Sequence, residues 1–126
     1  MYDNDPTAIV QRMFAAFGAG DFDALLATVH SESRWKYYGA NPRLSAGEFN
    51  GRDEVGRFFE GIVARVEVTA FEPREWVAEG DTVVIFGSES GRVRATGEEF
   101  TNVWSQKYVV RENLIVEMEE YNIEVR

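Results

Sequence analysis

The sequence contains no cysteine and a single histidine, His30. Without cysteine there is no disulfide, no thiolate nucleophile and no thiolate metal ligand. A Ser-His-Asp triad would have to use His30, and a metal site would need almost all its ligands from carboxylates, which show no clustered spacing. No glycine-rich phosphate loop follows a predicted strand. We therefore expect neither a metal nor another cofactor.

Long apolar runs and an excess of positive charge are also lacking. No run reaches the roughly 18 apolar residues of a membrane-spanning helix. The 126 residues include 13 Lys and Arg against 22 Asp and Glu, a net charge of −9, which disfavours nucleic acid and anionic membranes as partners. Residues 1–5 are acidic and polar, unlike a secretory signal, so a cytoplasmic location is expected. With 44% hydrophobic residues, the chain reads as one globular domain over 1–126.

Helical patterns fall mainly in the first half of the chain. Asp5 caps a helix that begins at Pro6 and ends at residues 18–20, where two glycines occur. Asp21 caps a short second helix with His30 at its C-terminal end. A third helix begins at Gly51, with apolar residues spaced along one side as far as residue 66.

Strand patterns dominate the second half. An aromatic strand over 34–38 is followed by a predicted loop over 39–50. Four more strands are predicted over 66–78, 82–95, 99–110 and 114–125, with a bulge near Pro73. Tight turns join these four, so most of the sheet is expected to be antiparallel. Helices early and strands late indicate an α+β domain with helices on one face of the sheet.

Three local patterns, taken in order, resemble the nuclear transport factor 2-like superfamily. They are Ala-Gly-Asp-Phe-Asp-Ala-Leu at 19–25, Gly-Glu-Phe-Asn-Gly-Arg-Asp-Glu-Val at 47–55 followed by Phe-Phe at 58–59, and the segments 79–84, 96–97 and 109–115. The specific group resembled is the SnoaL-like, ketosteroid isomerase-related set, over nearly the whole chain. The resemblance implies a cone-shaped, strongly curved, mostly antiparallel sheet that encloses a pocket with three N-terminal helices, the cystatin-like architecture.

The resemblance also implies which strand faces line the pocket, since alternate residues of a strand share a face. The ligand-binding residues expected from this are Met13, Phe17, Trp35, Phe59, Phe86, Asn102, Trp104, Tyr108, Met118 and Asn122. The expected ligand is a small, mostly apolar molecule.

Catalytic positions of three related enzyme groups are not all retained. Ketosteroid isomerases use a tyrosine donor, a carboxylate base and a protonated aspartate, which correspond here to Met13, Tyr37 and Gln106, so steroid isomerisation is not expected. SnoaL-like polyketide cyclases use a histidine, which corresponds to Gln106, and an aspartate, which corresponds to Glu120 or Asn122. Limonene epoxide hydrolase-like enzymes need two inward carboxylates flanking an arginine, and the sequence does not indicate such a set.

Glu120 is the remaining candidate for a general base. Burial in an aromatic cavity favours the neutral form of a carboxyl group, which suits proton transfer near neutral pH. Tyr37 or Tyr108 would donate to an oxyanion and Gln106 would orient a carbonyl. Glu120 follows Glu117 and Glu119, however, and in a register shifted by one residue it would belong to an acidic strand in solvent or in a dimer interface.

Three classes of function follow from these patterns. The first is an isomerase, cyclase or hydrolase that acts by proton transfer on a small apolar carbonyl or polycyclic compound. The second is a binding protein that uses the same pocket without chemistry, and the third is a dimerisation domain. A homodimer through the outer sheet face is expected in any case, because that face is predicted to expose Val83, Ile85, Val103, Val109, Ile115 and Ile123.

Overall fold

The computed structural model describes residues 4–41 and 44–125, and the side chains among them outside 40–46. These residues include three helices: α1 (Pro6–Gly18), α2 (Phe22–Leu26) and α3 (Gly51–Arg65). As predicted, Asp5 caps α1 by accepting from the backbone N–H of Ala8 at 3.1 Å, and Asp21 caps α2 through Ala24 at 3.0 Å. These caps satisfy N–H groups that the first turn of each helix leaves unpaired.

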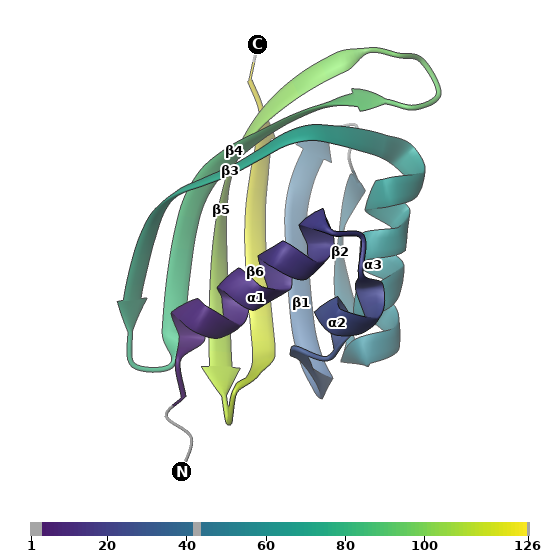
Figure 1. Ribbon diagram of the computed structural model, residues 1–126. Coiled ribbons are helices and arrows are strands. Elements are labelled where there is room, and N and C mark those ends of the chain that lie inside the picture. The colour runs from purple at the N-terminus through teal and green to yellow at the C-terminus, as the bar shows by residue number, and fades with distance from the viewer. Residues whose placement is uncertain (1–3, 42–43, 126) are drawn as a thin grey trace.

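The strands form one curved sheet that wraps around α1 (Figure 1). Their bounds are β1 (Val29–Asn41), β2 (Leu44–Asn50), β3 (Val66–Glu79), β4 (Thr82–Val93), β5 (Glu99–Arg111) and β6 (Leu114–Glu124). The order is β2-β1-β6-β5-β4-β3, and every neighbouring pair is antiparallel except β1 with β6. The predicted α+β class and curved sheet are confirmed. The expected bulge near Pro73 appears as a register shift between Pro73 and Glu75.

Two sequence predictions about local structure are wrong. Residues 44–50 form β2, an edge strand paired with β1, and not part of a loop. Glycine and polar residues give this strand a weak pattern, and its pairing partner determines its conformation. His30 lies in β1 and not at a helix end, because α2 ends at Leu26; its Nδ1 accepts from the backbone N–H of Glu32 at 2.9 Å.

Glycines of β4 allow large side chains of β5 to lie flat on the sheet. A Cβ atom at Gly87 would lie 2.5 Å from Cζ2 of Trp104 and 2.5 Å from the backbone oxygen of Glu72. Real Cβ atoms do not approach other atoms so closely, so only glycine fits between Trp104 and β3. The absence of a side chain at Gly87 therefore leaves the inner face free for the Trp104 ring.

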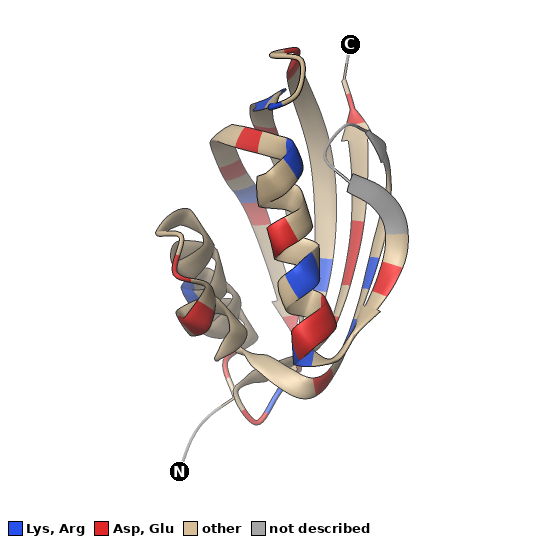
Figure 2. Cartoon of the chain, turned by 90° about the vertical axis from the view of Figure 1, so that its right-hand side faces the viewer, with Lys and Arg blue, Asp and Glu red and all other residues tan. Residues whose placement is uncertain are grey.

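The helices cover the concave side of the sheet. α1 lies across this side, and α3 packs against β1 and β2 (Figure 1). Charged residues of both signs lie along α3 (Figure 2). Within residues 4–41 and 44–125, no helix is long and apolar enough to cross a membrane.

Candidate functional site

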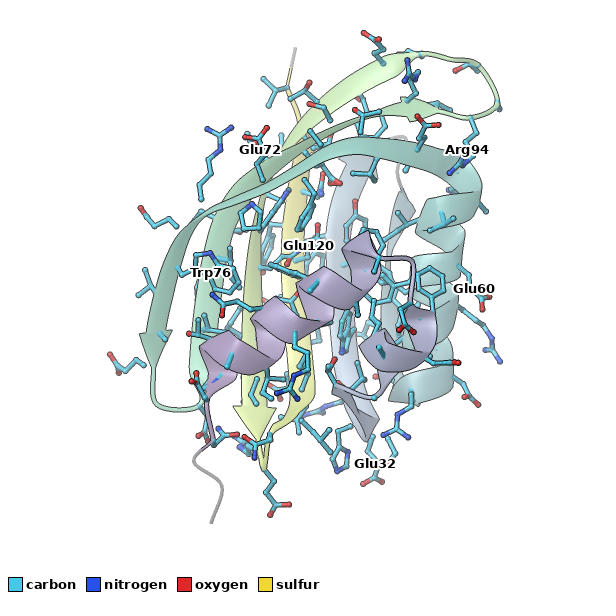
Figure 3. The ribbon with its side chains drawn as sticks, viewed as in Figure 1. Glu32, Glu60, Glu72, Trp76, Arg94 and Glu120 are labelled. Carbon is cyan, nitrogen blue, oxygen red and sulfur yellow. The ribbon has the colours of Figure 1, made fainter. Side chains whose placement is uncertain are left out.

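The three residues predicted to be catalytic lie in one row across the sheet. Tyr37 on β1 and Gln106 on β5 are the register partners of Glu120, which lies between them on β6. Glu120 is 1% exposed and lines a cavity under α1, at the centre of the molecule (Figure 3). The alternative register, with Glu120 in solvent, is thereby excluded. The catalytic roles themselves stay a prediction.

The inner face of β4 differs from the prediction by one residue. Phe86 was expected in the pocket but is 46% exposed on the outer face, whereas Glu89 is 2% exposed on the inner face. Ile85, Gly87 and Gly91 share the inner side with Glu89. Both faces of β4 carry apolar residues, so alternation alone does not determine its register. The signal that was missed is the pair of glycines, whose face must adjoin the large side chains of β5.

Glu89 gives the interior a second carboxylate, which the sequence did not indicate. The Nδ2 group of Asn122 donates to Oε2 of Glu120 at 2.9 Å and to Oε2 of Glu89 at 3.2 Å. One amide therefore holds two buried carboxylates from different strands. No arginine lies between these two carboxylates among the described contacts; Arg92, at the exposed end of β4, pairs with Glu67 at 3.4 Å.

Tyr108 and Gln106 form a second polar contact on the inner face. The Tyr108 hydroxyl donates to Oε1 of Gln106 at 2.7 Å, and both side chains are buried. The hydroxyl proton of Tyr108 is therefore directed at Gln106. The predicted use of that proton for an oxyanion requires this hydrogen bond to break.

Among the side chains that the structure describes, two other buried polar groups have no hydrogen-bond partner. They are the side-chain amide of Asn102, whose nitrogen and oxygen are both unpaired, and Nε1 of Trp104. Trp35 provides the contrast, because its Nε1 donates to Oγ of Ser33 at 2.8 Å. Unpaired buried polar groups are rare in folded proteins and need a specific explanation.

The central cavity is small and mostly aromatic. Its volume is about 30 Å³, enough for about one water molecule or two. Four predicted pocket residues besides Trp35 and Tyr108 line it: Met13, Phe17, Phe59 and Met118. Asn102, Trp104, Asn122 and Tyr37 are buried beside it without lining it.

A larger groove lies outside this cavity, between α1, α3 and β3. Its volume is about 720 Å³, within the usual range for small-molecule sites. Five side chains line both spaces and form the wall between them: Phe14, Phe17, Ile62, Val68 and Phe71. A molecule of more than a few atoms therefore reaches Glu120 from this groove only when this wall moves.

Metal ligands are not clustered in this site. No group of three or more His, Asp and Glu side chains within the described ranges is placed to bind a metal ion. The chemistry available from these residues is proton transfer and hydrogen bonding.

Comparison with known proteins agrees with the fold. The model of the SnoaL-like domain matches residues 10–118. The chain belongs to this family. A search of curated proteins finds no match.

Solved structures of this SnoaL-like protein's relatives extend the comparison over nearly the whole chain. An NTF2-like protein from Burkholderia xenovorans LB400 is 31% identical, with a TM-score of 0.83 over 97% of this chain and 92% of that one. TerC, co-crystallised with polyporic acid, is 20% identical, with a TM-score of 0.79 over 92% and 89%. A protein with a ketosteroid isomerase-like fold from Catenulispora acidiphila DSM 44928, in complex with trimethylamine, is 18% identical, with a TM-score of 0.74 over 90% and 83%. The last two show a shared fold.

Proposed function

We propose that this SnoaL-like protein is an enzyme that moves a proton on a small, mostly apolar carbonyl compound, with Glu120 as the base. The observation that carries the proposal is the buried pair of Glu120 and Glu89, which share the amide of Asn122 beside an aromatic cavity. A buried carboxylate is expensive to retain in a core unless it has a use. Two of them at one point favour acid–base chemistry over packing.

The proposed step needs a base and a hydrogen-bond donor. Glu120 takes a proton from the carbon next to the carbonyl group, and the electron pair of the broken C–H bond moves onto the carbonyl oxygen. When the enolate is conjugated with a C=C bond, return of the proton from Glu120 to the far carbon of that bond gives an isomer. When the enolate carbon instead attacks a second carbonyl group, the π electrons of that group move onto its oxygen, which takes the proton back from Glu120 as the ring closes. The Oε2 atoms of Glu89 and Glu120 are both hydrogen-bonded to Nδ2 of Asn122, so the distance between them cannot exceed the sum of the two hydrogen-bond lengths. Glu89 therefore lies near enough to Glu120 to take part in proton transfer.

Proton exchange on a simple ketone tests this step without knowledge of the natural substrate. The protein is incubated with 1-indanone in D₂O, and loss of the proton signal next to the carbonyl is followed by NMR. The variants are Glu120→Gln and Glu89→Gln. Glu119→Gln is the matched control, because Glu119 adjoins Glu120 on β6 but belongs to the opposite face. Binding of 1-indanone without exchange would favour the alternative, a binding protein without chemistry.

We also propose that two copies of the chain pair through the outer face of the sheet. Of the residues predicted to form this face, Val103 and Ile123 are exposed, at 45% and 64%, whereas Val83, Ile85, Val109 and Ile115 are buried. The four buried residues were wrongly assigned to the exposed surface, in β4 because of the same register error. The exposed apolar side chains of the outer face are instead Tyr38, Val77, Phe86, Val103, Tyr121 and Ile123.

Charges on the same face support a second copy as the partner. Lys36, Glu119 and Lys107 are register partners in a row across β1, β6 and β5. A symmetric dimer places one patch against itself, and a patch with both signs is self-complementary despite the net charge of −9.

Sedimentation at micromolar concentration tests the dimer. We expect the wild type to sediment as a dimer and Ile123→Asp as a monomer, while Val63→Asp, an exposed position on α3, stays dimeric. A monomeric wild type would contradict this proposal and leave the acid–base proposal unaffected.

We also propose a cytoplasmic location for the protein, which suits a chain without cysteine.

A further inference from the structure

Asn102 and Trp104 present unpaired donors on the inner face of β5. Asn102 is fully buried and neither atom of its amide has a hydrogen-bond partner, and Nε1 of the buried Trp104 has none either. Leaving a buried donor unpaired lowers stability, and an apolar side chain of similar shape avoids this loss. Such groups are explained when a ligand supplies the missing partner.

The two unpaired donors come from positions of β5 that adjoin Glu89 and Asn122 in the sheet. Asn102 is the register partner of Glu89 on β4, and Trp104 is the register partner of Asn122 on β6. The hydrogen bond from Asn122 to Glu89 must therefore cross β5 diagonally, between Asn102 and Trp104. Neither residue lines the cavity, so a ligand group beside the carboxylates reaches these two N–H donors only when the side chains that cover them move.

We propose that the amide N–H of Asn102 and the indole N–H of Trp104 hold the carbonyl oxygen of the substrate. The inference rests on the proposed function and adds the groups that bind the oxygen. As Glu120 removes the neighbouring proton, negative charge collects on that oxygen, and two N–H donors directed at it stabilise the charge. The assignment replaces Tyr108, whose hydroxyl is donated to Gln106.

The aromatic wall connects this oxygen site to the outer groove. Phe71 stacks on the Trp104 ring, with centroids 5.0 Å apart and planes at 11°. Phe71 also lines both the cavity and the groove. When Phe71 moves away from Trp104, the wall between the cavity and the groove loses one of its side chains and the indole ring of Trp104 loses its cover at the same time. The ligand class that fits is a ketone or enone with an apolar ring system, with its oxygen toward β5.

Binding of two matched probes tests the oxygen site. 1-Indanone has the carbonyl group, and indane has nearly the same shape without it. The indole N–H signals of the three tryptophans are recorded by NMR on protein labelled with ¹⁵N, and single Trp→Phe variants assign them. Trp35 is the internal control, because its N–H is already bonded to Ser33.

We expect 1-indanone to move the Trp104 indole proton downfield and indane to leave its hydrogen-bonding state unchanged. Asn102→Leu should weaken binding of 1-indanone about tenfold and leave binding of indane unchanged. Equal affinity for the two probes, no shift at Trp104, or no binding of either at the solubility limit would each overturn the inference. A shift at Trp104 without proton exchange would retain the oxygen site and refute only the acid–base function.

Discussion

Glu89 on β4 and Glu120 on β6 are separated by a whole strand, yet their Oε2 atoms accept hydrogen bonds from the same Asn122 nitrogen, at 3.2 and 2.9 Å. Neighbouring strands are about 4.8 Å apart, so the two side chains lean toward each other across β5. The curvature of the sheet favours this approach, because it brings the inner faces of β4 and β6 closer together (Figure 1).

Asn122→Leu tests whether the amide holds the carboxylate pair. Leucine has a similar volume but no donor, so each carboxylate loses a hydrogen bond. We expect the free energy of unfolding to fall by about 1–3 kcal/mol, measured by urea denaturation. The same substitution in a Glu89→Gln, Glu120→Gln background should be less harmful, because neutral amides replace the charges. Equal losses in the two backgrounds would show that Asn122 acts only through packing.

Asn102→Leu is expected to raise the free energy of unfolding, whereas Asn122→Leu lowers it. The change removes two unpaired polar atoms from the core, so the free energy of unfolding should rise by about 1 kcal/mol and the melting temperature with it. Gln106→Leu is the control and should lower stability, because it removes the acceptor that the Tyr108 hydroxyl uses. If Asn102→Leu destabilises the protein, its amide has a structural partner and the oxygen site loses its main support.

Strong local patterns predicted most of the fold. Helix caps at Asp5 and Asp21, and tight turns between long strands, depend on neighbouring residues and can be read directly from the chain. β2 could not be read in this way, because its conformation depends on pairing with β1. His30 was misplaced for a related reason: the apolar Val29 continues the helical pattern of α2 but begins β1.

The candidate site was predicted where one face of a strand is clearly apolar or aromatic. On β5 and β6, alternation correctly placed Gln106, Tyr108 and Glu120 inside. On β4 it failed, because Phe86 is apolar and exposed whereas Glu89 is charged and buried. Hydrophobic patterning assigns a charge to the solvent side, so a functional carboxylate in the core is the type of residue that it misses.

Tyr121 on the outer face gives a prediction about pH. Its hydroxyl donates to Oε2 of Glu119 at 2.8 Å, and this hydrogen bond, with smaller contributions from burial and the nearby charge, raises the pKa of Tyr121 above its ordinary value of 10.0. The unfolded chain therefore loses this proton at a lower pH than the folded protein does. The stabilisation is present below pH 10.0 and is lost as the pH rises through the higher pKa of the folded state.

Phenolate absorbance measures this titration, with Tyr121→Phe used to subtract the other tyrosines. The midpoint of Tyr121 should lie above 10.0 in the wild type and move down toward that value in Glu119→Gln. A midpoint at or below 10.0 in the wild type would contradict the hydrogen bond.

The rate of proton exchange on 1-indanone tests the central claim most directly. Loss of a general base usually lowers a rate by about 10²–10⁴-fold, so Glu120→Gln should reduce the exchange catalysed by the protein by about that factor. Glu119→Gln should exchange at the wild-type rate. Wild-type exchange no faster than in buffer, or equal rates for Glu120→Gln and Glu119→Gln, would contradict the assignment of Glu120 as the base.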